Sequence, residues 1–393
     1  MSYIEVMARF EEFRGKALTF LFFMLFVWFV SFSIRIVFSP ILPLVEDEFA
    51  VNHAKASAIF TFLSAGYGLS VILSGLFSGR AGYKRTIMLS LGLLACLAFL
   101  IPAVHRFYLL YFAAFFLGFA HGMYIPSAIP LITEYYTEKN WGKAIAIHDT
   151  GASLAIFATP LVVLFLLHFF PWRGIFVVYG CAFVVFLGVF CLAATEVKIH
   201  DPARALFREI VRIRSLWFMT CIWVFGAGSN LGIYSITPLY LTKELGLTID
   251  YANTILGVSR LVSIGVAVAC GFIVDRFSLR RIMFFLLAVT SVFTVLLGLS
   301  PVRHTGVLLF FQAFFVTGFF PVGLVAIART FAREMRGLAT GVILSASFFM
   351  GGGVMPWLLG VSGDLYSFRL GITILGVLTL FASTLVFRLR ELK

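Results

Sequence analysis

Long apolar runs alternate with short polar and charged segments along nearly the whole chain. Each run is about 20 residues long or longer, which is the length that a helix needs to cross a hydrocarbon core of about 30 Å. Backbone hydrogen bonds must be satisfied internally in lipid, and the runs are too long for barrel strands, so we expect helices. The pattern predicts an all-α membrane protein with twelve transmembrane helices, at residues 17–45, 56–78, 86–104, 107–133, 143–170, 174–195, 215–242, 253–274, 282–301, 306–328, 338–363 and 368–387.

The pattern repeats after 196 residues, which is half the chain. Residues 34–88 match the segment 196 positions further on without a gap, so that Arg80 meets Arg276. The same shift aligns Arg173 with Arg369. We therefore expect two pseudo-symmetric six-helix halves, at residues 1–195 and 215–393, joined by a basic cytoplasmic linker at residues 196–214. Parallel halves of this kind are typical of transporters that bind their substrate between them and rock about it.

The charge of the chain supports this topology. Only 12% of the residues are charged and 61% are hydrophobic, whereas soluble domains carry roughly 25% charged residues. With twelve spans, the loops on one side of the membrane hold 22 of the 30 lysines and arginines, and the loops on the other side hold six. The positive-inside rule then places both termini in the cytoplasm. The net charge of +12 is explained by the basic loops on the cytoplasmic side of the membrane, so no nucleic-acid partner is expected.

Enzymatic and metal-binding functions find no support in the sequence. The five cysteines lie in apolar runs without a C-x-x-C pair, so we expect core residues rather than disulfides or metal ligands. No phosphate-binding loop or nucleophile–base spacing occurs, so neither an enzyme activity nor a cofactor is expected. The first span is longer than the apolar core of a signal peptide and is expected to be retained. The short termini favour a multi-pass protein of a prokaryotic inner membrane.

Two matching loops lie between the second and third spans of each half. They read GLFSGRAGYKR at residues 75–85 and GFIVDRFSLRR at residues 271–281. They resemble the signature G-x-L-x-D-R-x-G-R-R/K of the major facilitator superfamily, and the span count and the repeat extend the resemblance over the whole chain. The resemblance implies transport by alternating access and a gating role for Asp275, Arg80 and Arg276. In the first half, Gly79 stands in place of the signature aspartate.

Two motifs of drug exporters in this family are missing. The fourth span, FFLGFAHGMYIP at residues 115–126, contains His121 in the region where proton antiporters carry an arginine. The fifth span, DTGASLAIFATP at residues 149–160, lacks the dense glycine–proline pattern of the exporters. A proton-driven efflux pump is therefore the weaker alternative.

Two arginines, Arg35 and Arg260, lie inside spans with no carboxylate within reach. A charged side chain at the bilayer centre costs about 2.5–3.5 kcal/mol. The helical rise places both arginines in the outer half of the membrane at similar depth, and the repeat sets Leu231 opposite Arg35 and Ser64 opposite Arg260. Because the guanidinium fork matches a carboxylate, we expect the two arginines to clamp a small organic anion, a mono- or dicarboxylate. The alternative is that each snorkels to the interface or donates to backbone carbonyls.

An arginine in span eight also resembles the oxalate–formate exchanger and monocarboxylate-transporter branches, where this residue contacts the carboxylate. Those relatives often carry an acidic residue one turn earlier, and Leu256 occupies that position here. The coupling mechanism of the monocarboxylate branch is therefore not carried over.

Titratable groups in spans four and five are candidates for proton coupling. His121 lies near the middle of span four, with Tyr124 on the same face of the helix. His148 and Asp149 lie near the start of span five. Histidine titrates near physiological pH, so His121 or the neighbouring pair can carry a proton. The alternatives are a packed histidine and an aspartate stabilised by the helix dipole.

Other polar residues complete the expected site. Asn230 and Tyr234 lie one helical turn apart on span seven and are expected to bind the substrate, together with Tyr67 and Tyr124. Gln312 is expected to bond a neighbouring helix, and the glycines at residues 351–353 indicate a bend or a close helix contact.

The sequence thus predicts a monomeric, proton-coupled importer of a small organic anion in the lipid bilayer. Anion exchange without protons is the leading alternative. A sensor without transport activity is disfavoured by the short tails.

Overall fold

The computed structural model describes residues 15–195, 207–262, 265–266, 269–270, 276–332 and 335–392. The described residues are helical and contain no β-strand. Eleven helical segments among them are long and apolar enough to cross a membrane. The predicted all-α membrane fold is confirmed. The remaining expected span, at residues 253–274, lies partly outside the described residues, and helix α12 (Ile249–Val258) forms its beginning.

Among the described residues, the first half of the chain contains eight α-helices. They are α1 (Lys16–Ile36), α2 (Phe38–Phe49), α3 (His53–Ala81), α4 (Tyr83–Leu100), α5 (Phe107–Gly122), α6 (Ile125–Tyr135), α7 (Trp141–Leu167) and α8 (Trp172–Ala193). Pairs of these helices form single spans, at Lys16–Phe49 and Phe107–Tyr135.

The second half begins, among the described residues, with the short helix α9 (Phe207–Ile210). It continues with α10 (Arg214–Ala227), α11 (Ile233–Leu239), α12, α14 (Leu279–Leu299), α15 (Thr305–Thr330), α16 (Arg336–Phe349), α17 (Met355–Leu365) and α18 (Phe368–Thr384). Residues 196–206 of the expected linker lie outside the described residues, so the predicted boundaries at 195 and 215 stay predictions.

The first span is interrupted between α1 and α2, where the sequence predicts one continuous run. Helix α1 ends at Ile36 and α2 begins at Phe38. Pro40 has no backbone N–H to donate to the carbonyl of Ile36, so the helical hydrogen-bond pattern is broken there. In the second half, a π-helical turn at Gly228–Gly232 joins α10 to α11, and another at Met350–Val354 joins α16 to α17.

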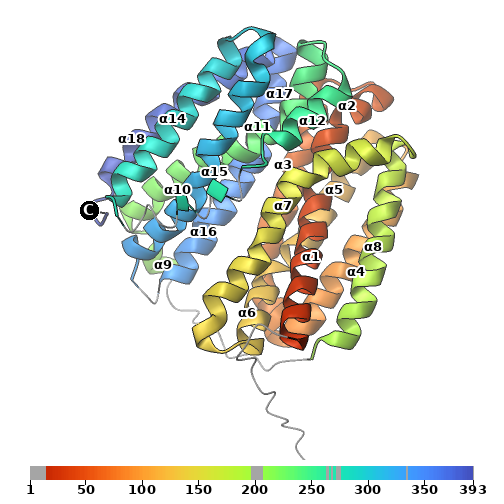
Figure 1. Ribbon diagram of the computed structural model, residues 1–393, viewed down its shortest axis with the longest axis vertical. Helices are drawn as coiled ribbons and strands as arrows, with labels where there is room; N and C mark the ends of the chain where they lie inside the picture. The colour runs from red at the N-terminus through yellow and green to blue at the C-terminus, as the bar shows by residue number, and fades with distance from the viewer. Residues whose placement is uncertain are drawn as a thin grey trace, which may run out of the picture.

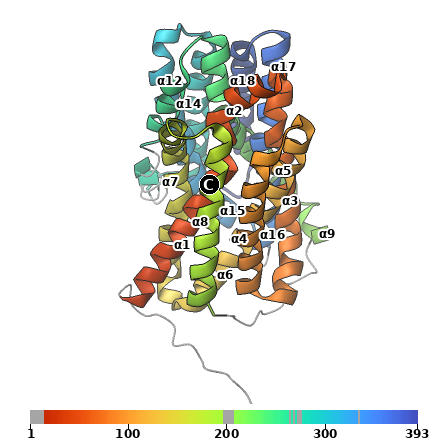
Figure 2. The same cartoon turned by 90° about the vertical axis from the view of Figure 1, so that its right-hand side faces the viewer.

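The two halves meet at one end of the molecule and diverge towards the other. Figure 1 shows α2, α11, α12 and α17 together at the top of the picture, whereas α1 and α7 diverge from α10 and α16 below. Figure 2 shows the same bundle turned by 90°. One hydrophobic core runs through the first half and the adjoining end of the second half. A separate core fills the other end of the second half, around Met219 and Met283.

Polar contacts between the halves concentrate at this end, which we call the joined end and define by Asp47, His53, Lys243 and Asp364. The Lys243 ammonium contacts the Asp47 carboxylate. The Asp364 carboxylate accepts the backbone N–H groups of His53 and Ala54, each at 2.9 Å. The first turn of α3 is thereby held against the last turn of α17.

Candidate functional site

Arg35 is buried, with 5% of its surface exposed, and three aromatic rings surround its guanidinium group. The guanidinium carbon lies 4.4 Å from the ring centre of Tyr67, 4.9 Å from that of Phe348 and 5.6 Å from that of Phe32. Within the described part of the chain, no carboxylate pairs with it and no acceptor takes a hydrogen bond from it. Cation–π contacts contribute about 0.5–2 kcal/mol each, so the rings partly stabilise the charge of Arg35 but do not neutralise it.

Arg260 is also buried, at 1% exposed, but it has a protein partner. Its Nη1 donates to the side-chain oxygen of Asn230 at 2.5 Å, and its Nη2 donates to the Asn230 backbone carbonyl at 3.4 Å. The guanidinium carbon lies 5.5 Å from the ring centre of Tyr234. Asn230 belongs to the π-helical turn at Gly228–Gly232, a geometry that recurs at functional sites.

Two polar atoms beside Arg260 are left without a partner. These are its own Nε and the hydroxyl of Tyr234. The alternative that an arginine donates to a backbone carbonyl therefore holds in part for Arg260, but not for Arg35. Asn230, which is expected to bind substrate, accepts these hydrogen bonds from Arg260.

The two guanidinium groups lie against different aromatic rings, Arg35 against Tyr67 and Arg260 against Tyr234. The rings around Arg35 come from both halves, since Phe348 lies on α16 and Tyr67 on α3. The partners of Arg260 all lie in the second half. The predicted clamp therefore stays a prediction.

The expected coupling residues of spans four and five gather around Trp28, which the sequence did not single out. The Trp28 ring lies nearly parallel to those of His121, Tyr124 and His148, at centre distances of 5.2, 5.4 and 5.9 Å. All four side chains are buried. His121 also lies 5.6 Å from Tyr67, which connects this stack to the surroundings of Arg35.

Hydrogen bonds in the stack leave a buried proton acceptor. The Tyr124 hydroxyl lies 3.2 Å from the Met24 carbonyl and 3.2 Å from Nε2 of His148. A carbonyl oxygen only accepts, so we infer that the Tyr124 O–H donates to the Met24 carbonyl. The Nε2–H of His148 then donates to the Tyr124 hydroxyl oxygen. Nδ1 of His148 then carries an unpartnered lone pair. Nδ1 of His121 contacts the Ser31 hydroxyl at 2.9 Å, and its Nε2 has no partner.

Asp149 lies on the exposed side of α7, where its carboxylate faces the indole of Trp28. The helix begins at Trp141, and its first turn holds no acidic residue. The alternative of an aspartate stabilised by the helix dipole is therefore wrong, because the effect of the dipole falls off within the first turn.

The residues of the signature loops that are expected to act in gating are only partly described. Arg80 and Arg276 are exposed, and Asp275 lies outside the described residues. Gln312 donates to the Ser229 carbonyl at 2.6 Å, so its expected role as a helix-bonding residue is confirmed.

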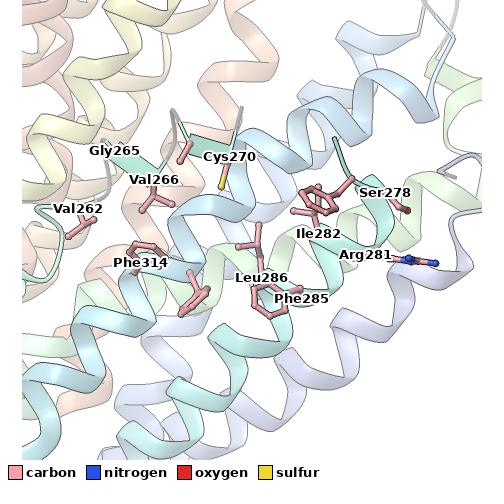
Figure 3. Close-up of a pocket in the computed structure, with 13 residues that line it drawn as sticks. Val262, Gly265, Val266, Cys270, Ser278, Arg281, Ile282, Phe285, Leu286 and Phe314 are labelled. Carbon is pink, nitrogen blue, oxygen red and sulfur yellow. The ribbon is translucent and has the colours of Figure 1, made fainter. Parts of the chain in front are cut away.

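A cavity of about 700 Å³ lies elsewhere, against α14 and α15. Figure 3 shows apolar side chains such as Val262, Leu286 and Phe314 around it, with Arg281 at the opposite end from Val262. The cavity contains none of the expected site residues.

Comparisons with known proteins agree with this fold. The family model described as Major Facilitator Superfamily matches residues 21–309 and 238–393. A protein TsgA homolog of Erwinia tasmaniensis is 24% identical over 59% of this chain and 59% of its own length. The nitrite extrusion protein of Bacillus subtilis is 22% identical over 69% of both chains. The match thus spans about three fifths of the first relative.

A solved structure, of a bacterial homolog to the human lysosomal transporter Spinster in an inward-facing and unoccupied conformation, is similar over most of the chain. It has a TM-score of 0.82 and 14% identity, and covers 96% of this chain and 98% of that one. This likeness concerns the fold alone.

Proposed function

Because this chain belongs to the Major Facilitator Superfamily, a family of transporters and not of enzymes, we propose that it is a secondary transporter of a small organic anion. The observation that carries the proposal is the state of Arg35. A buried guanidinium without an acceptor is costly, and a bound carboxylate supplies both the acceptor and the charge. The Arg260 Nε and the Tyr234 hydroxyl are further unpartnered donors for such a ligand.

One relative favours an anion of low molecular weight. It is named a nitrite extrusion protein, and nitrite, like a carboxylate, presents two oxygens to a guanidinium group. We keep a mono- or dicarboxylate as the proposed substrate. The absence of an acidic partner for Arg35 in the described residues favours a negative substrate over neutral or cationic drugs.

Proton coupling is the proposed driving force. His148 offers a buried acceptor nitrogen, and Asp149 is the next residue on the same helix. A proton carried with a monoanion makes import electroneutral, so the membrane potential does not oppose uptake. Exchange of one anion for another requires no such group and stays the second candidate, because it needs only the arginines.

The orientation follows from the charge distribution. The joined end carries few basic residues, and the opposite end carries most of them, so the positive-inside rule assigns the joined end to the outside. The structure then corresponds to a state whose outer side is closed. We propose a monomer in a bacterial inner membrane with both termini in the cytoplasm.

Uptake by proteoliposomes tests this function. The purified chain is reconstituted, and radiolabelled mono- and dicarboxylates are offered with and without an imposed proton gradient. We expect uptake of at least one anion that rises several-fold with an inward proton gradient, and loss of uptake in Arg35→Gln and Arg260→Gln. Arg106→Gln, at an exposed loop position, serves as the control and should transport normally.

Each other outcome has a definite meaning. Equal uptake with and without the gradient, together with stimulation by internal anion, establishes exchange. Transport of neutral or cationic drugs but no anion overturns the proposal in favour of efflux. Unchanged anion uptake in both arginine variants removes the arginines from the substrate site.

A further inference from the structure

We propose that the aromatic surroundings of Arg35 restrict the transported anion to planar oxyanions, such as carboxylates and nitrite, and reject tetrahedral ones such as phosphate and sulfate. This inference rests on the proposed anion transport and narrows its substrate class. It follows from the shape and the charge distribution of the three rings, Phe32, Tyr67 and Phe348, which we call the aromatic box.

The box covers the guanidinium group on more than one side. The rings of Tyr67 and Phe348 are nearly perpendicular, at 87°, with centres 5.6 Å apart, and the guanidinium carbon lies over both. Phe32 adds a third wall from the same helix as Arg35. A ligand can therefore reach the group only along the directions that the rings leave free.

The electrostatics of the rings add to this restriction. The face of an aromatic ring is negative, so it attracts the guanidinium cation and repels the oxygens of an anion placed over it. The N–H groups of a guanidinium point outward in its own plane. A planar anion that binds through two oxygens keeps both of them in that plane. A tetrahedral anion bound in the same way holds its other oxygens above and below the plane, so it needs open space on both sides of the guanidinium group.

The polar content of the box favours the same class. The three rings offer one polar atom, the hydroxyl of Tyr67. A tetrahedral anion with four oxygens would leave several of them desolvated without donors, which costs free energy for each. The apolar remainder of a small carboxylate instead suits the aromatic walls. Phe348 comes from the opposite half, so the box is complete only when the halves lie together as in this structure.

The test is anion binding by the detergent-solubilised full-length chain, followed through its melting temperature. Sodium formate, acetate, nitrite, sulfate and phosphate are titrated at constant ionic strength, and the same titrations are made with Arg35→Gln. The subtraction is needed because sulfate and phosphate stabilise proteins without binding to a site. We expect the Arg35-dependent shift for the planar anions only, with apparent dissociation constants at least tenfold lower than for sulfate and phosphate.

Variants of the box test the role of its walls. Phe348→Ala should reduce the tenfold preference for planar anions to less than threefold, and Phe348→Leu, which keeps an apolar side chain but removes the ring, should reduce it in the same direction. Phe349→Ala is the matched control, because Phe349 is the next residue on the helix and is 36% exposed. It should keep the preference of the unmodified chain.

The outcomes separate this inference from the proposed function. Arg35-dependent binding of sulfate or phosphate as tight as that of the planar anions overturns the inference and leaves anion transport standing. Arg35-dependent binding of planar anions without uptake of any anion in proteoliposomes overturns the proposed function instead. A preference that Phe348→Ala and Phe348→Leu leave unchanged overturns the role of the box.

Discussion

At the scale of single residues, Arg35 and Arg260 carry the same charge in two different states. Arg260 already has a neutral acceptor, the side chain of Asn230, whereas Arg35 has only aromatic neighbours among the described residues. Arg260 is therefore held in place before a ligand arrives. Arg35 is the group that gains most from an anion, because its donors are unused.

Replacing Asn230 tests this difference. In Asn230→Leu, Arg260 loses its short hydrogen bond, and an unsatisfied buried donor costs about 1–3 kcal/mol. We expect a lower melting temperature that is partly restored by acetate, since an anion that binds the folded state raises its stability. Differential scanning fluorimetry with and without acetate measures both effects.

The matched control is Gln312→Leu. Gln312 is also a buried amide with a backbone partner, the Ser229 carbonyl at 2.6 Å, but it holds no guanidinium group. This variant should lose stability without an increase in its response to acetate. An equal acetate response in the two variants would mean that Asn230 does not act through Arg260.

The sequence predicts the unpaired arginines but not their neighbours. That Arg35 and Arg260 lack carboxylates follows from the scarcity of acidic residues in the spans, and this can be read directly along the chain. The contact of Arg260 with Asn230 joins two residues that are 30 positions apart, one in the turn after α12 and the other in the π-helical turn between α10 and α11, so spacing within one helix cannot reveal it. Trp28 and Phe348 gave no signal because 47 phenylalanines and six tryptophans occur in the chain, and most of them are lipid contacts or core.

At the scale of the elements, the π-helical turns at Gly228–Gly232 and Met350–Val354 contact each other through glycine. A Cβ atom at Gly351 would lie 2.4 Å from the Val224 carbonyl oxygen and 2.6 Å from the Gly228 nitrogen. Both atoms are backbone, so they cannot move aside as a side chain can. The backbones of α10 and α16 approach each other closely here because no side chain separates them.

A single methyl group added at Gly351 should force α10 and α16 apart. Gly351→Ala is expected to lower the free energy of unfolding by about 1–3 kcal/mol, the usual cost of overpacking, and to lower the melting temperature by several degrees. It should also weaken transport, since Asn230 lies in the facing turn. Thermal melting and uptake in proteoliposomes measure the two effects.

Gly341→Ala is the control, because a Cβ atom there meets nothing within 4 Å. Alanine is a better helix former than glycine by about 0.5–1 kcal/mol. This variant should be as stable as the unmodified chain or slightly more stable. A loss at Gly341 as large as that at Gly351 would show that helix propensity, and not the backbone contact, decides the outcome.

The spans are predicted well because hydropathy fixes where helices lie in a bilayer. The expected run at 174–195 is found at Trp172–Ala193, and that at 215–242 is found at Arg214–Glu244. The break between α1 and α2 was missed because hydropathy does not change at Pro40. The π-helical turns were missed because the glycines that form them allow many conformations.

At the scale of the whole molecule, the repeat appears as two equivalent contacts at the outer ends of the halves. Glu48 accepts the indole N–H of Trp172 at 2.5 Å and pairs with Arg173 at 2.7 Å. Its repeat counterpart Glu244 accepts the backbone N–H groups of Phe368 and Arg369. Each glutamate ties the first span of its half to the beginning of the sixth.

These two contacts should contribute independently. Glu48→Ala and Glu244→Ala are each expected to lower the free energy of unfolding by about 0.5–1.5 kcal/mol, since Glu48 is partly exposed. The double variant should lose the sum within about 0.5 kcal/mol, because separate sites are additive. Chemical unfolding in detergent measures all three values.

Glu138→Ala, at an exposed position, is the control and should change stability little. A loss in the double variant well below the sum would contradict independence. It would indicate that one half unfolds first and that only its contact determines the measured stability.

The contact between Asp47 and Lys243 has a consequence for the origin of the chain. The two positions are 196 residues apart, which is the repeat offset, so each stands opposite its own counterpart on the symmetry axis. Two identical subunits would place aspartate against aspartate or lysine against lysine there, and the like charges would repel. A homodimer of one half could not form this ion pair between aspartate and lysine. Two copies that mutate separately are free of that constraint, and in this chain they carry opposite charges at this position.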